Sequence, residues 1–236
     1  MKRRPKQPLR EETSAPSASE AGTIMQVKVW LVGISPMMWR RVLVPTPFTL
    51  RELHGVIQVV MGWHGIHLYQ FRLRAARYGS WELSASSPDV TLAALRFRKG
   101  ARFLYEYDLN IPWRHEVRIE DRLEPEAGKT YPICAAGGGA CPPEDCGGPA
   151  DFMTRRDDML SLASFEDLVT LAEIVGGVVL ERRPEVLDNE ETRWRLAQAL
   201  DRSQARQHAQ GQPFTRRTIN ARLRRGEHRD LMDQQY

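Results

Sequence analysis

Residues 113–120, WRHEVRIE, alternate without interruption between two kinds of side chain. One face of the alternation carries aromatic and apolar groups together with one histidine: Trp113, His115, Val117 and Ile119. The other face carries only Arg and Glu. A period of two is the period of a β-strand, and an apolar face opposite a charged face is typical of antiparallel sheets covered on one side. The segment therefore predicts a half-buried antiparallel strand.

Further strand-like runs occur at residues 24–34, 39–44, 67–73 and 101–108. Helical spacing of apolar residues occurs at 49–61, 164–175 and 191–209. The first helix begins with the capping-box form Thr49-x-x-Glu52, and Gly62 ends its pattern. Strands and helices mix without a strand–helix–strand rhythm. The predicted fold class is therefore α+β, with a largely antiparallel sheet packed with a few helices.

The ends of the chain differ in composition from its middle. Residues 1–23 are rich in Pro, Ser and charge and are predicted to form a disordered basic tail. Residues 193–236 carry ten basic and four acidic residues, whereas the net charge of the whole chain is +4. The predicted organisation is a disordered tail over 1–23, one α+β domain over 24–189 and a basic helical tail over 190–236.

No stretch approaches the roughly 18 consecutive apolar residues of a membrane span, and the basic start lacks the apolar segment of a signal peptide. Both observations predict a cytoplasmic protein with no membrane partner. The three cysteines, Cys134, Cys141 and Cys146, are an odd number confined to one short segment. This pattern favours reduced thiols or metal ligands over a disulfide framework.

Four ordered strings carry a family resemblance: WRRVLVPTPFTLRELHGVIQVVMGW, HLYQF, FLYEYD followed by WRHEV, and YPICAAGGGACPPEDCGGP. Over roughly residues 25–185 the chain resembles the plasmid pRiA ORF-three-like family, which includes TnpR-like passenger proteins of an insertion element. The resemblance implies an association with mobile elements and supplies no recombinase active site. The chain departs from the family's Tyr-Asp-Phe-Gly-Asp-x-Trp-x-His pattern at Asn110 and Ile111, where the Gly and the second acidic residue are replaced.

The segment 131–149 is rich in Gly and Pro and is predicted to be a long irregular loop. Its cysteines have the spacing Cys-x6-Cys-x4-Cys, and thiolates bind zinc well. A candidate zinc site consists of Cys134, Cys141, Cys146 and His115, with His54, His67, Glu144 or Asp145 as alternative fourth ligands. The alternative is a rigid loop whose cysteines pack as small apolar residues.

A second candidate site is a pocket formed by His54, His67, Asp108 and Trp113 together with His115. Buried histidines with shifted pKa values favour functional sites, although a histidine on an apolar face is more often a hydrogen-bonded core residue. The sequence does not match the known enzyme signatures. Gly128-Lys129-Thr130 has Leu123 where a phosphate-binding loop needs its first glycine. No base is identified for Cys134 as a nucleophile.

The C-terminal tail contains a basic helical pattern, FTRRTINARLRR, over 214–225. Its candidate contacts to DNA or RNA phosphates are Arg216, Arg217, Arg222, Arg224 and Arg225. The alternative is a solvated tail, because two short helices with few apolar positions lack a core of their own.

Two classes of function follow from these features. The first hypothesis is a mobile-element-associated, non-catalytic binding module with nucleic acid as its partner. The alternative is a small metal-dependent enzyme or redox protein that uses the Cys segment and the nearby histidines, with zinc as its candidate cofactor. An interaction adaptor using the Pro/Gly-rich loop is a third reading, without a sequence signature of its own.

Overall fold

The structure is a computed structural model that describes residues 22–158, 161–211 and 213–232. The described residues form a seven-stranded sheet in the order β4-β3-β5-β6-β1-β2-β7, and every neighbouring pair is antiparallel. The strands are β1 (Ile24–Leu31), β2 (Trp39–Pro45), β3 (Tyr69–Leu73), β4 (Ala76–Gly79), β5 (Arg102–Tyr107), β6 (Trp113–Leu123) and β7 (Ile133–Gly138). The predicted α+β class with an antiparallel sheet is confirmed. Most of the predicted N-terminal tail, up to residue 21, lies outside the described residues.

The α-helices are α1 (Leu50–Met61), α2 (Gly148–Asp158), α3 (Leu162–Val175), α4 (Glu190–Ala209), α5 (Arg216–Arg225) and α6 (Glu227–Met232). Short turns complete the described elements: η1 (Trp81–Leu83), the π-helical η2 (Gly176–Leu180) and η3 (Pro184–Asp188). Helix α1 has the predicted capping box, because the Thr49 side chain accepts from the Glu52 backbone and the Glu52 carboxylate accepts from the Thr49 backbone. None of the described helices is both long and apolar enough to cross a membrane.

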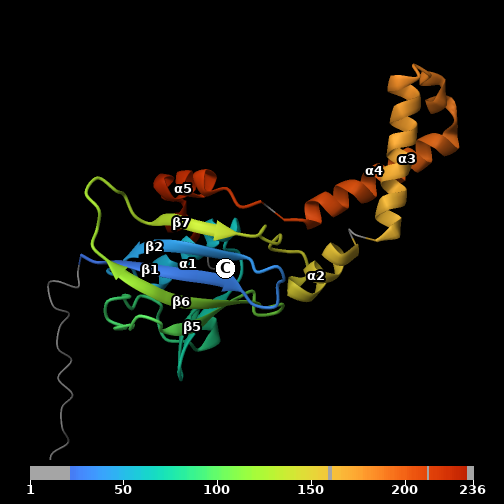
Figure 1. The fold of residues 1–236 in the computed structure, drawn as a ribbon. Coiled ribbons are helices and arrows are strands. Elements are labelled where there is room, and N and C mark those ends of the chain that lie inside the picture. Colours follow the sequence, from blue (N-terminus) through green and yellow to red (C-terminus); the bar gives the residue numbers. More distant parts are fainter. Residues whose placement is uncertain (1–21, 159–160, 212, 233–236) are drawn as a thin grey trace, which may run out of the picture.

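Strand β6 lies in the middle of the sheet, between β5 and β1. The alternating residues of its apolar face, Trp113, His115, Val117 and Ile119, are all fully buried. They join the apolar side of α1 in one core, and Figure 1 shows α1 against the sheet. The alternation is thus explained by burial of one face of the strand against a helix.

The expectation of an irregular loop over residues 131–149 is wrong for its first part, which forms the edge strand β7 paired with β2. Two glycines lie in this strand because neighbouring groups leave no room for a side chain. A Cβ at Gly137 would meet the Phe214 ring at 2.6 Å, and one at Gly138 would meet the Trp39 indole at 3.0 Å. Tertiary contacts therefore override the low strand propensity of glycine.

Helices α5 and α6 pack on the body of the molecule, and α5 lies beside β7 in Figure 1. Ile219 and Leu223 of α5 are buried in the main core, and His228 of α6 is buried against α1. These helices lack a core of their own, as their sequence indicates, and they use the core of the sheet instead. Residues 216–232 thus extend the body, although the sequence alone predicts a separate tail.

The approach of α6 to α1 depends on Gly55. A Cβ at this position would overlap the backbone carbonyl of His228. We expect Gly55→Ala to lower the free energy of unfolding by about 1–3 kcal/mol, because backbone cannot yield as a flexible side chain can. Gly176→Ala is the matched control, since Gly176 has helical dihedral angles and open space around it. We expect that control to be neutral or stabilising by up to about 1 kcal/mol.

Urea unfolding of the two alanine variants measures this difference. Equal stability of both variants would contradict the close packing of α6 on α1.

Helices α3 and α4 form a hairpin that extends away from the sheet, and α2 leads into it (Figure 1). The two helices are joined by an ion-pair group in which the buried Asp167 carboxylate binds Arg202 at 2.6 Å and Arg206 at 2.7 Å. Hydrogen bonding to Arg202 lowers the pKa of Asp167 to about 2. An ion-pair group thus joins the two helices, and Ile174 of α3 and Ala199 of α4 are buried.

Candidate functional site

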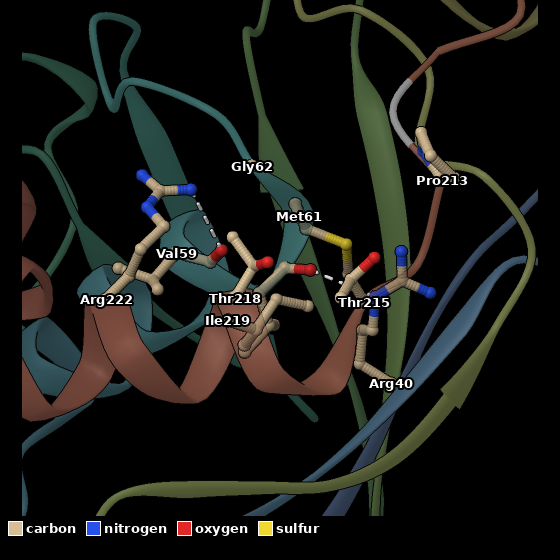
Figure 2. A pocket seen from close by; sticks show the side chains of 10 residues that line it. Arg40, Val59, Met61, Gly62, Pro213, Thr215, Thr218, Ile219 and Arg222 are labelled. Carbon is tan, nitrogen blue, oxygen red and sulfur yellow. Dashed lines mark hydrogen bonds between the residues drawn. The ribbon is translucent and has the colours of Figure 1, made fainter.

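A surface cavity of about 290 Å³ opens between the C-terminal end of α1, strand β2 and helix α5. Figure 2 shows its lining, in which α1 presents the end of its backbone and α5 presents side chains. The polar side chains of the lining are Arg40, Thr215, Thr218 and Arg222. No acidic side chain is among the lining residues. The charged side chains of the lining are therefore the two arginines, Arg40 and Arg222.

Arg40 is 1% exposed and forms no ion pair within the part of the chain that the structure describes. Its Nε donates to the Val60 carbonyl at 3.0 Å, and its Nη1 donates to the carbonyls of Trp39 at 2.8 Å and Gly138 at 2.9 Å. The guanidinium lies 4.6 Å from the centre of the Phe214 ring. Burial lowers the pKa of Arg40, but the ordinary pKa of an arginine is so high that the side chain stays charged. The carbonyl at the end of α1 and the Phe214 ring compensate this charge.

The five arginines predicted from the C-terminal pattern differ in their surroundings. Arg222 Nε lies 2.5 Å from the Glu227 carboxylate, and Arg225 Nη2 lies 2.6 Å from the same carboxylate. Arg222 also donates to the Val59 carbonyl at 3.4 Å, which places it at the end of α1. These two arginines share one counter-charge within the protein and are thus less available to an anionic partner.

The other three arginines, Arg216, Arg217 and Arg224, are exposed and form no ion pair with a described residue. At 3.6 residues per turn they share one side of α5 with Asn220. Asn220 fixes that side to β7, because its amide accepts from the Cys134 N–H at 2.7 Å and donates to the Cys134 carbonyl at 3.0 Å. One helix attached to β7 thus presents three arginines without an ion-pair partner among the described residues, and Arg216 Nη1 also donates to the Ala135 carbonyl at 3.3 Å.

Beside these cations lies a second cleft of about 260 Å³, between α5 and the connection from β6 to β7. Arg224 and Asn220 line one wall, and Gly128, Lys129 and Thr130 line the other. The string rejected as a phosphate-binding loop thus lies next to the basic helix. Lys129 pairs with Glu126 on the same connection, so its charge is partly balanced.

The cysteines of the candidate zinc site are all buried. The Cys134 thiol donates to the Ala136 carbonyl at 3.5 Å, and burial raises its pKa to about 11. Burial also raises the pKa of the Cys141 and Cys146 thiols. Among residues 22–158, 161–211 and 213–232, no group of three or more His, Cys, Asp or Glu side chains is placed to hold a metal ion. The zinc site therefore stays a prediction.

The rest of the Cys segment is bound into the core by hydrogen bonds that the sequence did not predict. The Trp63 indole donates to the Pro142 carbonyl at 2.9 Å, and the Trp113 indole donates to the Glu144 carbonyl at 2.9 Å. Tyr107 donates to the buried Glu144 carboxylate. These contacts favour the reading in which the segment is a rigid structural loop.

The predicted pocket histidines lie in a buried aromatic cluster. His54 Nδ1 is 2.6 Å from the Tyr105 hydroxyl, and its ring stacks on Tyr69 at 3.7 Å. His115 Nδ1 is 3.0 Å from the Trp113 carbonyl, and its ring lies 5.1 Å from that of Tyr105. Burial lowers the pKa of both histidines to about 3. Both are therefore neutral at physiological pH.

His67 lies at the edge of this cluster, with its ring 5.5 Å from that of Tyr107. Asp108 lies in the turn after β5, where its Oδ1 accepts from the Asn110 N–H at 3.3 Å. The structure thus brings His54, His115 and Trp113 into one cluster and places Asp108 in a structural turn. A catalytic role for these residues stays a prediction.

Sequence reasoning missed Arg40 as a functional candidate. A signal was present, because Arg40 shares a strand face with Val42 and Val44, and a charge on an apolar face requires compensation. The groups that compensate it come from α1, β7 and Phe214, which are distant in the sequence.

The fold and these sites define an α+β protein with one antiparallel sheet, covered by α1 and the C-terminal helices. The chain belongs to the plasmid pRiA4b ORF-3-like protein family, whose sequence model matches residues 23–167. The resemblance drawn from the four sequence strings is confirmed. Helix α5 lies outside the matched residues, so its arginines are not part of the family match.

Two relatives illustrate the similarity. The chain is 38% identical over 133 residues to the uncharacterized protein y4hQ of Sinorhizobium fredii, covering 54% of this chain and 68% of the relative. It is also similar to the crystal structure of a protein of unknown function, MM3350 from Methanosarcina mazei Go1. That match has a TM-score of 0.57 and 31% identity, and it covers 62% of this chain and 88% of the other.

Proposed function

We propose that this protein is a non-catalytic binding module that binds nucleic acid through the exposed side of α5. The observation that carries the proposal is the group of three exposed arginines, Arg216, Arg217 and Arg224, that lack a carboxylate partner among the described residues. Neutralising a phosphate releases condensed counterions, so each such cation contributes affinity that depends on salt.

The rigid attachment of α5 supports this proposal further. Ile219 and Leu223 bury the inner side of the helix, and Asn220 binds β7. The arginines are therefore presented without the entropy cost of ordering a free tail. The plasmid origin named in the family's description is in keeping with a nucleic-acid partner and with a role on mobile elements.

The alternative, a metal-dependent or redox enzyme, stays a prediction. The raised thiol pKa of the cysteines and the lowered pKa of the buried histidines leave these groups uncharged at neutral pH. Uncharged thiols are poor nucleophiles. Elemental analysis of reductively purified protein, together with titration of its free thiols, tests this alternative.

The test of the proposed function is fluorescence anisotropy with labelled duplex DNA across a salt series. We expect the double variant Arg217→Gln with Arg224→Gln to bind more weakly. The slope of the logarithm of affinity against the logarithm of salt concentration should become less steep by up to about 1.8, because each lost phosphate contact removes about 0.9. The matched control carries Arg193→Gln with Arg195→Gln on α4, which removes the same charge from exposed positions elsewhere.

Wild-type affinity and salt slope should persist in the control. Equal losses in both double variants would show that only net charge matters, and this would contradict the α5 site. Absence of salt-dependent binding by the full-length protein to both duplex DNA and RNA would refute nucleic-acid binding altogether.

A further inference from the structure

A larger cavity, of about 710 Å³, lies at the opposite edge of the sheet from α5. It is formed by the β3–β4 hairpin, the segment 95–98 and the start of β5. In Figure 1, β5 and α5 lie on opposite sides of the central strands. The volume falls within the range of about 300–1,000 Å³ that is usual for small-molecule sites.

Four arginines line this cavity: Arg74, Arg96, Arg98 and Arg102. No acidic side chain is among the lining residues. Arg102 pairs with Glu116 at 2.8 Å, whereas Arg74 and Arg98 are exposed and form no ion pair with a described residue. Arg74 and Arg98 therefore place positive charge at a cavity that has no acidic side chain in its lining, which favours an anionic ligand with several oxygen acceptors.

The same cavity has aromatic walls. Phe97 and Phe103 stack at 4.9 Å with an interplanar angle of 13°. Phe103 is buried, whereas Phe97 and Tyr78 are half-buried and line the cavity. Arginines next to partly exposed aromatic rings can hold a phosphate and stack on a planar base at the same time.

Two of the arginines occupy backbone conformations that usually favour glycine. Arg74 has a φ of 54° in the tight β3–β4 turn, where Leu73 pairs with Ala76. Arg96 has a φ of 46° directly after a helical turn. A residue other than glycine is strained at such positions, and strain of this kind concentrates at ligand sites. The arginine side chains are thus present at a cost to local stability.

We propose that this cavity binds a nucleotide unit, with phosphate on Arg74 and Arg98 and the base against the aromatic wall. The unit is either a free mononucleotide or one residue of a single strand. Binding here does not require α5, because the two sites lie at opposite edges of the sheet.

The experiment measures adenosine monophosphate binding to the full-length protein by calorimetry. Competition with a fluorescein-labelled strand of twelve thymidines then distinguishes the two sources. We expect Arg98→Gln to weaken the affinity for adenosine monophosphate by about tenfold, because a charge-assisted hydrogen bond is lost. Arg74→Gly should also weaken binding while the melting temperature stays equal or rises, since glycine relieves the strained turn.

Two controls accompany these variants. Arg195→Gln removes one exposed charge from α4, and the double variant Arg217→Gln with Arg224→Gln removes the α5 charges. Both should bind adenosine monophosphate like the wild type. Loss of this binding in the α5 variant would overturn the separate site, whereas its retention supports this cavity even if α5 fails to bind duplex DNA.

The other outcomes of the binding experiments also either support or overturn the proposal. Competition between adenosine monophosphate and the strand supports a strand ligand, and binding of the mononucleotide alone supports a free nucleotide. Displacement by inorganic phosphate at equal concentration would overturn the role of the base. Wild-type affinity in both Arg98→Gln and Arg74→Gly, or no binding of either probe, would overturn the proposal.

Discussion

Below about pH 6 the protein is expected to lose stability steeply, because two fully buried histidines must stay uncharged in the folded state. Burial lowers the pKa of His54 to about 3 and that of His115 to about 3, against about 6.5 in an unfolded chain. Between these pH values the unfolded chain binds more protons. As the pH is lowered from about 6.5 to about 3, the free energy of unfolding therefore decreases by about 1.4 kcal/mol per pH unit for each histidine.

Together the two histidines would remove about 3 kcal/mol per pH unit, against a usual total stability of about 5–15 kcal/mol. Acid unfolding is thus expected well above pH 3. Backbone hydrogen bonds oppose part of this effect, at Leu231 for His54 and at Trp113 and Tyr105 for His115, but burial is the largest cause of both pKa shifts. Burial raises the pKa of Tyr105, which faces both rings and stays neutral, and Arg51 further lowers the pKa of His54.

Ion-paired carboxylates with lowered pKa values, such as Asp167 and Glu120, lose their stabilising effect only below about pH 4.5. The window from pH 6.5 to 4.5 therefore isolates the histidines. Urea unfolding at several pH values in this window measures the slope. His54→Gln should reduce the slope by about 1.4 kcal/mol per pH unit, whatever it does to the stability at pH 7. His115 and the buried His228, whose pKa burial also lowers, account for the slope that remains.

NMR titration of the wild-type imidazole rings provides a reading that needs no variant. We expect neither the His54 ring nor the His115 ring to gain a proton above pH 5 while the protein is folded. An ordinary titration near pH 6.5 for either ring would contradict its dry, buried environment.

Replacement of Trp113 by alanine is expected to lower the free energy of unfolding by about 3–5 kcal/mol. The side chain is fully buried, its ring lies 5.3 Å from that of Trp63, and its indole N–H binds the Glu144 carbonyl. The variant therefore leaves a cavity in the core and releases one attachment of the Cys segment.

Trp81→Ala is the matched control, because Trp81 is 77% exposed. Its effect on stability should stay within about 0.5 kcal/mol. Urea unfolding measures both variants under the same conditions. Similar losses from the two replacements would show that the Trp113 side chain does not pack as described.

Local patterns predicted much of the fold because they report interactions that are close in the sequence. The capping box at Thr49 and Glu52 marks the start of α1, and the alternation over 113–120 marks β6. Both features depend on backbone hydrogen bonding and on the burial of one face. The segment of β7 was not predicted, because its pairing with β2 and its contact with Phe214 come from distant parts of the chain.

For the candidate sites, too, the sequence identified residues but not their distant partners. Sequence identified the arginines of α5, yet the shared partner Glu227 determines that Arg222 and Arg225 are less available than Arg217 and Arg224. The sequence also identified the cysteines and histidines as candidates. Their spacing carries no information about the tryptophan and tyrosine groups that surround them.

The amino-acid sequence by itself determined the α+β class, the α1 cap, the alternation of β6, the family and the basic character of the C-terminal segment. Only the tertiary structure decided where charge remains uncompensated. Arg40 is compensated by the carbonyl at the end of α1, whereas Arg74 and Arg98 line a cavity that has no acidic side chain among its lining residues. The physical reason is that hydrophobic pattern and capping are local properties, while electrostatic balance depends on groups that folding brings together from distant parts of the chain.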